Sequence, residues 1–156
     1  MGNRKEVLII IPAYNEEKTI VPVLEKLEQP EIAQIADVLV MNDASSDATN
    51  HVTKKRKHDV VTHVFNLGYG SGLQLGYKYA VRKDYRYVIQ MDADGQHDVC
   101  NIPKIYKELQ TEDENGYLPD IVLGSRFIEG SSDFSVSFAK KIAFGWFRII
   151  LKTGTG

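Results

Sequence analysis

Residues 7–20 read VLIIIPAYNEEKTI, an unbroken apolar run that gives way at once to polar residues. Val7 to Pro12 is rich in β-branched side chains, which is typical of a strand covered on both faces. The segment that follows places Ile20, Leu24 and Leu27 on one face of a helix. The stretch therefore predicts a buried strand that leads directly into an amphipathic helix.

The same strand–helix unit recurs along the chain. Ser45 or Ser46 is expected to cap the second helix, and Pro103 suits the first turn of the last one. Strands alternating with helices predict right-handed crossovers and an α/β, Rossmann-like fold, a mainly parallel open sheet with helices on both faces. The predicted strands cover residues 7–12, 37–42, 60–65, 85–91 and 121–123, and residues 108–120, ELQTEDENGYLPD, are expected to form a surface loop.

Length and composition limit the classes of protein. The 156 residues suit a single domain with a real core, residues 1–156, which we expect to be truncated at its C-terminus. The chain has 19 Lys and Arg and 21 Asp and Glu, and the resulting net charge of -2 argues against nucleic acid as a partner. The one cysteine, Cys100, has no partner for a disulfide, so packing in the reducing cytoplasm is expected.

The segment of residues 134–156, FSVSFAKKIAFGWFRIILKTGTG, mixes aromatic and basic residues. We expect either a helix packed on the sheet or an amphipathic surface that meets a membrane or a further part of the protein. No apolar stretch of the sequence approaches the roughly 18 residues needed to cross a bilayer.

Polar clusters follow the first four predicted strands. Ligands of an open parallel sheet bind at the carboxyl ends of the strands, near the point where the strand order reverses. Each cluster alone is compatible with a turn or a helix cap, whereas four at one edge predict a binding site. The clusters are PAYNEE (12–17), NDASSD (42–47), NLGYGSG (66–72) and DADGQH (92–97).

Asp92 and Asp94 raise the question of what compensates two carboxylates so close together at a strand end. Residues two apart in an extended segment face the same side, and two carboxylates suit Mg²⁺ or Mn²⁺ whose other ligands are water and phosphate. A calcium loop counted from Asp92 would need Gly and Glu where His97 and Pro103 stand. His97 itself is open to two interpretations, a helix cap or a ligand.

Other nucleotide and phosphate chemistries fit the same residues less well. No G-x-G-x-x-G follows the first strand and no Walker lysine is present, which disfavours a dinucleotide fold and a P-loop. Phosphatases of the haloacid dehalogenase type also place D-x-D-G at a strand end, although normally after the first strand. This phosphatase remains an alternative.

The other clusters contain groups that suit a nucleotide. Asp43 ends a strand, where a carboxylate accepts hydrogen bonds from a base or a ribose hydroxyl. Tyr14, beside Pro12 and Ala13, offers a wall for the base ring. The glycine-rich segment of residues 66–76, which includes Gly68, lets backbone and a helix N-terminus approach a phosphate or, equally, suits tight packing.

In these motifs the sequence resembles the family 2 glycosyltransferases of GT-A fold, especially the branch of dolichol- and polyprenyl-phosphate sugar synthases. The matching segments, within residues 6–130, are IPAYNEEKTI, VMNDASSDAT, NLGYGSGLQLG, QMDADGQH and GSRF. The resemblance implies that Pro12, Ala13, Tyr14, Glu16 and Asp43 hold the nucleoside of a nucleotide-sugar, that Asp47 supports this loop, that Asp92, Asp94 and Gln96 bind Mg²⁺ or Mn²⁺, and that Arg126 contacts a phosphate. The branch often has a basic residue in the third loop, where this chain reads GYGSG.

The resemblance also implies a reaction, the inverting transfer of a hexosyl group from a UDP- or GDP-sugar. A hydroxyl acceptor such as a glycan needs a general base, which a polyprenyl phosphate does not. Because Glu129 and Asp133 are the carboxylates after GSRF and neither is a convincing base, a polyprenyl phosphate is the expected acceptor. The full-length protein is then expected in the cytoplasm or at the cytoplasmic face of the membrane, and a nucleotide-sugar-binding domain without turnover is the alternative.

Overall fold

The computed structural model describes residues 5–95 and 97–124. A first compact unit spans Met1–Val122, and the second, Leu123–Gly156, lies almost wholly outside the described residues. Gln96, Arg126 and the aromatic segment of residues 134–156 are therefore outside the described residues too.

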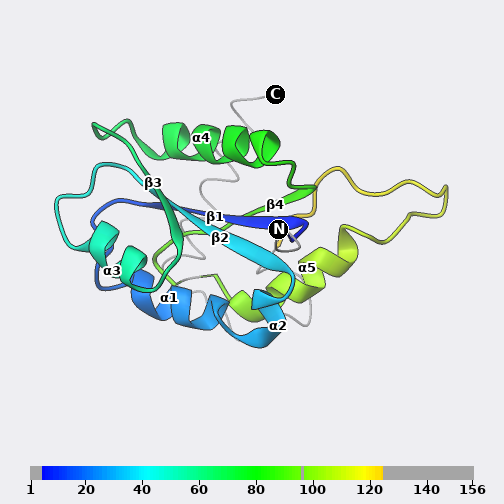
Figure 1. The fold of residues 1–156 in the computed structure, drawn as a ribbon. Coiled ribbons are helices and arrows are strands. Elements are labelled where there is room, and N and C mark those ends of the chain that lie inside the picture. Colours follow the sequence, from blue (N-terminus) through cyan, green and yellow to red (C-terminus); the bar gives the residue numbers. More distant parts are fainter. Residues whose placement is uncertain (1–4, 96, 125–156) are drawn as a thin grey trace, which may run out of the picture. The chain divides into compact units, whose positions relative to one another are not determined.

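Four parallel strands form one sheet in the order β3-β2-β1-β4 (Figure 1). The first residue of β1, Val7, pairs with Ala36 of β2 on one side and with Tyr87 of β4 on the other. The strand order reverses between β1 and β4, which makes the crevice at the carboxyl ends of these strands the expected ligand site. The strands are β1 (Val7–Ala13), β2 (Ala36–Asn42), β3 (Asp59–Thr62) and β4 (Tyr87–Gln90).

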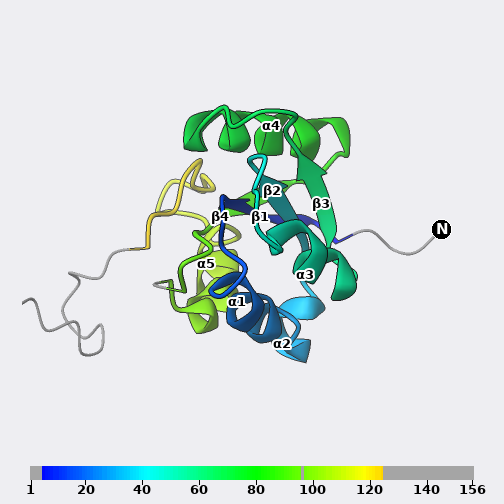
Figure 2. The same ribbon diagram turned by 90° about the vertical axis from the view of Figure 1, so that its left-hand side faces the viewer.

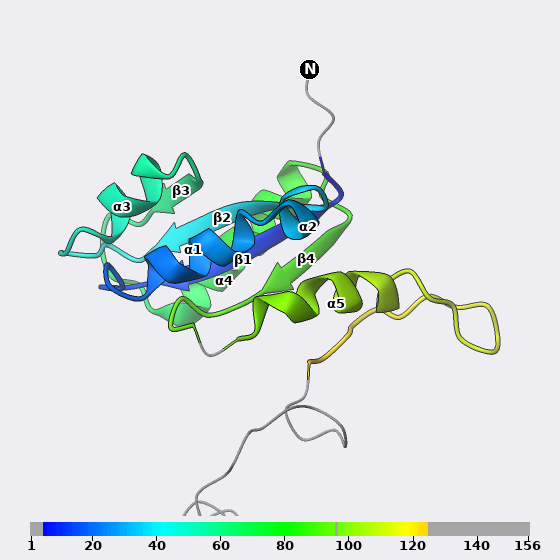
Figure 3. The ribbon, with the colours of Figure 1, turned by 90° about the horizontal axis from the view of Figure 1, so that it is seen from below.

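Helices cover both faces of the sheet, as the sequence predicts. The long helix α4 lies on one face, and α1, α2, α3 and α5 lie on the other (Figures 1 and 2). Seen from below, α1 and α2 lie over β1 and β2, whereas α5 lies beside β4 (Figure 3). The helices are α1 (Ile20–Leu27), α2 (Pro30–Ala33), α3 (Thr49–Lys55), α4 (Tyr69–Arg82) and α5 (Ile102–Glu108), the last preceded by a short 3₁₀ turn (Val99–Asn101).

Strand β1 explains why residues 7–11 are apolar without interruption. Val7, Ile9 and Ile11 pack against α1 and its neighbours, whereas Leu8 and Ile10 pack under α4. Successive side chains of a strand point to opposite faces, and here both faces are covered. The α/β fold with a mainly parallel sheet is thus confirmed.

Helix α4 comes unusually close to β1 at Gly76. A Cβ added to this glycine would lie 3.2 Å from both Cγ2 and Cδ1 of Ile10. That separation is shorter than ordinary van der Waals contact, so a residue without a side chain lets the helix settle on the strand. The contact sets how closely the middle of α4 lies on β1.

Several local predictions were wrong. Cys100, which was expected to be packed, is exposed. Residues 121–123 form no strand; Ile121 and Leu123 are exposed, because three apolar residues without a hydrogen-bonded neighbour do not offset the entropy of an ordered backbone. Strand β3 ends at Thr62 rather than at residue 65, because the last residue of its partner β2 is Asn42, whose carbonyl already accepts the N–H of His63.

Another wrong prediction concerns the start of α3. The helix begins at Thr49 after Ala48, so neither Ser45 nor Ser46 is its cap. The carboxylate of Asp47 accepts the Thr49 N–H at 3.0 Å and takes over the role of the cap. Pro103 does lie in the first turn of α5, as predicted. Among the described residues, no helix combines the length and the apolar character that crossing a membrane requires.

Candidate functional site

A cavity of about 440 Å³ opens at the carboxyl ends of the strands. It lies where the strand order reverses, and every one of the four strands contributes a following loop to its wall. We call it the strand-end cavity. Its lining consists of Pro12, Ala13, Tyr14, Glu16, Asp43, Asn66, Gly68, Tyr69, Asp92, Ala93 and Asp94. Eight of the predicted site residues therefore line one cavity, although the chain separates them by up to about eighty positions.

The loops after β1 and β2 hold each other. The N–H of Asn15 donates to Ser45 Oγ at 3.0 Å, and the side-chain oxygen of Asn15 accepts the N–H of Ser46 at 2.9 Å. The N–H of Glu17 donates to Asp47 Oδ2 at 3.0 Å. Asp47 thus lies outside the cavity lining and braces the loop that carries Tyr14.

The environment of Asp47 favours its charged form. Burial alone would raise the pKa of this carboxyl, but hydrogen bonds from the hydroxyl and N–H of Thr49 and from the N–H of Glu17 outweigh burial and lower the pKa. A carboxylate bound by several donors is stabilised as the anion. Asp47 is therefore a fixed negative acceptor between the two loops.

Both braced loops contain a residue in the left-handed backbone region. Asn15 has φ +57° and Ala44 has φ +56°. Asparagine adopts this conformation readily, whereas alanine does so at a cost of about 1–2 kcal/mol. Such strain persists where surrounding contacts impose it, and here it lies next to the cavity.

Asp43 clamps the loop between β3 and α4. Its side chain is almost buried, with 6 % of the residue exposed, and its Oδ1 accepts the Leu67 N–H and the His63 Nδ1–H, both at 2.8 Å. Its Oδ2 accepts the Gly68 N–H at 2.7 Å. Since a carboxylate oxygen accepts about two hydrogen bonds, Oδ2 keeps one acceptor position.

These contacts also set the charge of Asp43. Burial raises its pKa, and the hydrogen bonds from Leu67, His63 and Gly68 lower it by more, so that the pKa lies below its usual value. The ionised group is therefore the acceptor that faces the cavity. Its remaining position suits a ribose hydroxyl or a ring N–H, which are neutral donors.

The N-terminus of α4 forms another part of the wall. Gly68, the residue before the helix, has φ +85°, which favours glycine, and a Cβ added to Gly68 or Gly70 would meet no atom within 4 Å. The first N–H groups of a helix have no partner within it, and the helix dipole favours an anion there. The space at Gly68 thus lets a phosphate approach the first turn of α4, whereas the N–H of Gly68 itself is donated to Asp43.

Asp92 and Asp94 line the cavity directly after β4. The side chain of Asp92 is 41 % exposed, its Oδ1 accepts the hydroxyl of Tyr69 at 2.9 Å, and its N–H donates to His97 Nδ1 at 3.0 Å. His97 thereby orients the loop of the two carboxylates.

Two carboxylates open to a cavity fit Mg²⁺ or Mn²⁺, which prefer oxygen ligands. Within residues 5–95 and 97–124, no group of three or more His, Cys, Asp or Glu side chains is placed to hold a metal. The remaining ligands would therefore come from water and from a phosphate of the substrate, which is how Mg²⁺ is commonly bound.

Sequence reasoning missed two residues of this site. Tyr69 lines the cavity and binds Asp92, and burial followed by this hydrogen bond raises the pKa of its hydroxyl, which keeps it a donor. His63 orients Asp43 from the end of β3. Tyr69 could have been found from its position directly after Gly68, at the start of the predicted helix. His63 could have been found as a polar residue at the end of an edge strand.

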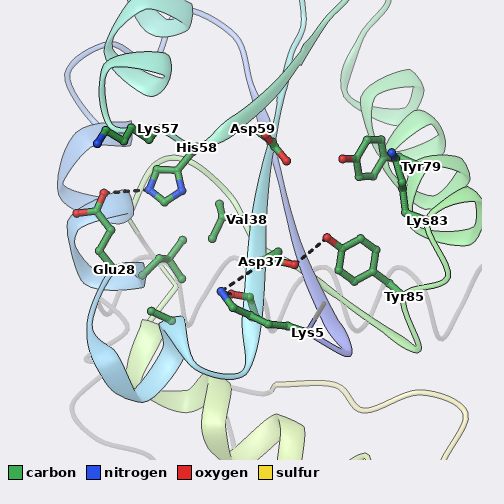
Figure 4. A pocket seen from close by; sticks show the side chains of 13 residues that line it. Lys5, Glu28, Asp37, Val38, Lys57, His58, Asp59, Tyr79, Lys83 and Tyr85 are labelled. Atoms are coloured by element: carbon green, nitrogen blue, oxygen red, sulfur yellow. Dashed lines mark hydrogen bonds and ion pairs between the residues drawn. The ribbon is translucent and has the colours of Figure 1, made fainter. Parts of the chain in front are cut away.

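A second and larger cavity, about 640 Å³, opens at the opposite, amino edge of the sheet (Figure 4). Some of its charged groups are paired: Lys5 lies 3.0 Å from Asp37 Oδ1, and the hydroxyl of Tyr85 donates to Asp37 Oδ2 at 2.9 Å. His58 Nε2 lies 2.9 Å from Glu28 on another wall. Size therefore does not mark the functional site; the strand-end cavity has the converging polar groups.

Comparison with known proteins bears on this geometry. The model of the family described as glycosyl transferase family 2 matches residues 8–150. The undecaprenyl-phosphate mannosyltransferase of Micrococcus luteus is 33% identical over 131 residues, which cover 80% of this chain and 49% of that protein. The chain spans about half the length of the curated relatives it matches.

Solved structures share the fold. The mannosyltransferase PcManGT of Pyrobaculum calidifontis, in complex with GDP-Man and Mn²⁺, superposes with a TM-score of 0.56 at 22% identity, over 70% of this chain and 34% of that chain. TarS 1-349 of S. aureus in complex with UDP superposes with a TM-score of 0.52 at 23% identity, over 69% of this chain and 33% of that chain. Both likenesses support the fold.

Proposed function

The chain belongs to glycosyl transferase family 2, and we propose that the protein transfers a hexosyl group from a UDP- or GDP-linked sugar to a polyprenyl phosphate, with inversion at the anomeric carbon. This family leaves the phosphatase alternative without support. Since the chain spans about half of its curated relatives, the full-length protein is the catalyst of this proposal, at the cytoplasmic face of a membrane.

One observation carries the proposal: the strand-end cavity has a carboxylate acceptor and an aromatic ring on one wall and a pair of carboxylates on another. Asp43 and Tyr14 come from the loops after β2 and β1, whereas Asp92 and Asp94 follow β4. Gly68, at the start of α4 and with open space on its Cβ side, lines the same cavity. A nucleoside diphosphate has the corresponding parts, a base and ribose joined to two phosphates.

Each wall has a proposed task. Tyr14 provides an aromatic face for the base, and the free acceptor position of Asp43 Oδ2 binds a ribose hydroxyl or a ring N–H. Asp92 and Asp94 hold Mg²⁺ or Mn²⁺, with Gln96 as a further predicted ligand. When bound, the ion offsets the negative charge that develops on the leaving diphosphate. The α4 N-terminus adds its dipole, and Arg126 is the predicted phosphate clamp.

The proposed acceptor follows from chemistry as well as from the relative in Micrococcus luteus, whose name gives undecaprenyl phosphate. A phosphate oxygen is already an anion and attacks the anomeric carbon without a general base. The same donor half would also serve a glycan acceptor if the remainder of the protein supplied a base. The acceptor assay decides between the two.

Calorimetry tests the donor site. UDP, GDP and their sugars are titrated with and without Mn²⁺ into the wild type and into an Asp92→Ala/Asp94→Ala variant. We expect Mn²⁺ to strengthen nucleotide binding to the wild type and to have no effect on the variant. The control, Glu112→Ala/Glu114→Ala, removes two exposed carboxylates with the same spacing and should bind as the wild type does.

A transfer assay with polyprenyl phosphate completes the test. Binding that ignores Mn²⁺ and survives the double variant would contradict the metal site. Metal-dependent binding without transfer, in both this chain and the full-length protein, would favour a nucleotide-sugar-binding domain without turnover.

A further inference from the structure

A line of hydrogen bonds runs over α4 and β4 and ends at Asp92. The hydroxyl of Tyr77 donates to Gln90 Oε1 at 2.8 Å, and Gln90 Nε2 donates to the oxygen of Tyr69 at 2.8 Å. The hydroxyl of Tyr69 then donates to Asp92 Oδ1 at 2.9 Å. Four side chains from two elements and the following loop thus form one relay.

Chemistry fixes the direction of every bond in the relay. An ionised Asp92 only accepts, so the single proton of the Tyr69 hydroxyl is committed to it. The Tyr69 oxygen must then accept from the amide nitrogen of Gln90, which turns the amide oxygen toward Tyr77. The orientation of the Gln90 amide is therefore determined by its neighbours at both ends.

The bonds of the relay are exposed to solvent. Exchange with water makes such bonds nearly neutral for folding. Their effect is on geometry: a carboxylate with one oxygen held by a donor has a fixed orientation of both oxygens. Partners of this kind orient the ligands of a metal and tune their affinity.

We propose that Tyr69 is a positioning residue, which holds the Asp92 carboxylate in the orientation that binds a divalent cation, while Gln90 and Tyr77 keep its hydroxyl aimed. The inference rests on the proposed function, because it assigns the cation to the same cavity. It adds a residue of α4 to a centre otherwise built from the loop after β4. Tyr69 touches neither reacting atom in this proposal; it acts through Asp92.

The chain offers a matched control for this bond. Tyr85 donates to Asp37 Oδ2 at 2.9 Å, which is the same chemistry at the same distance, but at the amino edge of the sheet. Tyr85→Phe therefore reports what the loss of a tyrosine–carboxylate bond does to the protein in general. Tyr69→Phe reports the same loss at the proposed cation site.

The experiment titrates Mn²⁺ into the wild type and into the variants Tyr69→Phe, Tyr77→Phe and Tyr85→Phe. Electron paramagnetic resonance follows free Mn²⁺, with and without saturating UDP or GDP. We expect Tyr69→Phe to weaken Mn²⁺ binding about tenfold or more, as the loss of a partner behind a metal ligand does. Tyr77→Phe, one link further away, should weaken it in the same direction by less. Tyr85→Phe should bind as the wild type does, and all four should unfold at closely similar temperatures.

Each result has a definite meaning. Equal Mn²⁺ affinity of Tyr69→Phe and wild type would overturn the inference, as would an equal loss in Tyr85→Phe or no Mn²⁺ binding by the wild type. A wild type that binds Mn²⁺ through Asp92 but binds no UDP or GDP would overturn the proposed function and leave the role of Tyr69 supported. A loss of metal-free nucleotide binding in Tyr69→Phe, with Mn²⁺ affinity unchanged, would make Tyr69 a nucleotide contact and overturn the inference.

Discussion

Replacing Asp43 by alanine should destabilise the protein through the loop between β3 and α4. The change removes the acceptor of the Leu67 N–H and of His63 Nδ1–H, each at 2.8 Å. The Gly68 N–H loses one acceptor as well but keeps Asn66 Oδ1 at 3.1 Å. Two hydrogen bonds to a charged group at about 1.5 kcal/mol each predict a loss of about 3 kcal/mol in the free energy of unfolding.

Solvent moderates this value. Leu67 is exposed, so water replaces part of its lost bond, and a loss of about 2–3 kcal/mol is the expected result. Asp43→Asn keeps the shape and one carbonyl oxygen and should lose about half as much. The loop carries Gly68 into the wall of the strand-end cavity, so nucleotide binding should fall with stability.

Urea unfolding at neutral pH, followed by far-ultraviolet circular dichroism, measures the effect as a shift of the midpoint at constant slope. Glu114→Ala, which removes an exposed carboxylate from the loop after α5, should stay within about 0.5 kcal/mol of the wild type. A similarly small change in Asp43→Ala would refute the clamp.

Three further results are expected. Gly76→Val should lower the free energy of unfolding by about 1–3 kcal/mol, because the new side chain meets Ile10. Gly70→Ala, which adds a methyl group in open space on the same helix, should raise it by about 0.5–1 kcal/mol. Thermal unfolding compares the two variants, and equal effects would contradict the close approach of α4 to β1. Asp47→Ala should lower stability by about 1–2 kcal/mol, since it removes the acceptor at the start of α3; an unchanged urea midpoint would argue against that role. The pKa of Asp43 is lowered in the folded protein, so its contribution to stability is full above the unfolded pKa near 4 and is lost as the pH falls through the folded pKa. The free energy of unfolding should therefore fall more steeply with acid in the wild type than in Asp43→Asn. Parallel curves for the two proteins would contradict this contribution of Asp43.

Much of the sheet could be predicted because burial on both faces leaves a plain mark in the sequence. The unbroken run of Val7 to Ile11 and the helical spacing of Ile20, Leu24 and Leu27 each correspond to an observed element. The predictions that failed concern local features. Residues 121–123 are as apolar as a strand, but a strand also needs a neighbouring strand to pair with, which the sequence pattern does not reveal. The same reason shortened β3, whose end is set by where β2 ends.

The site was predictable to the extent that topology governs it. Parallel strands bring their carboxyl ends to one edge, which is why Tyr14, Asp43 and Asp92 line one cavity although they come from different units. Side-chain partners were beyond reach of pattern, because they depend on how α4 is placed over the sheet. The bond between Tyr69 and Asp92 is of this kind, whereas the one between His63 and Asp43 depends on where the neighbouring strands β3 and β2 end.

The brace between the loops after β1 and β2 has a consequence for how such sequences diverge. The N–H of Asn15 donates to Ser45, and its side-chain oxygen accepts the N–H of Ser46. The N–H of Glu17 donates to Asp47, so each loop stabilises the conformation of the other. Each of these bonds joins the backbone of one loop to a side chain of the other, so a change at Asn15 keeps its N–H bond to Ser45 but removes the acceptor of the Ser46 N–H. Because that N–H belongs to the backbone, no substitution at residue 46 restores the bond. Among homologous sequences, the side chains at residues 15, 45 and 47 should therefore keep a hydrogen-bond acceptor, whatever residue stands opposite them.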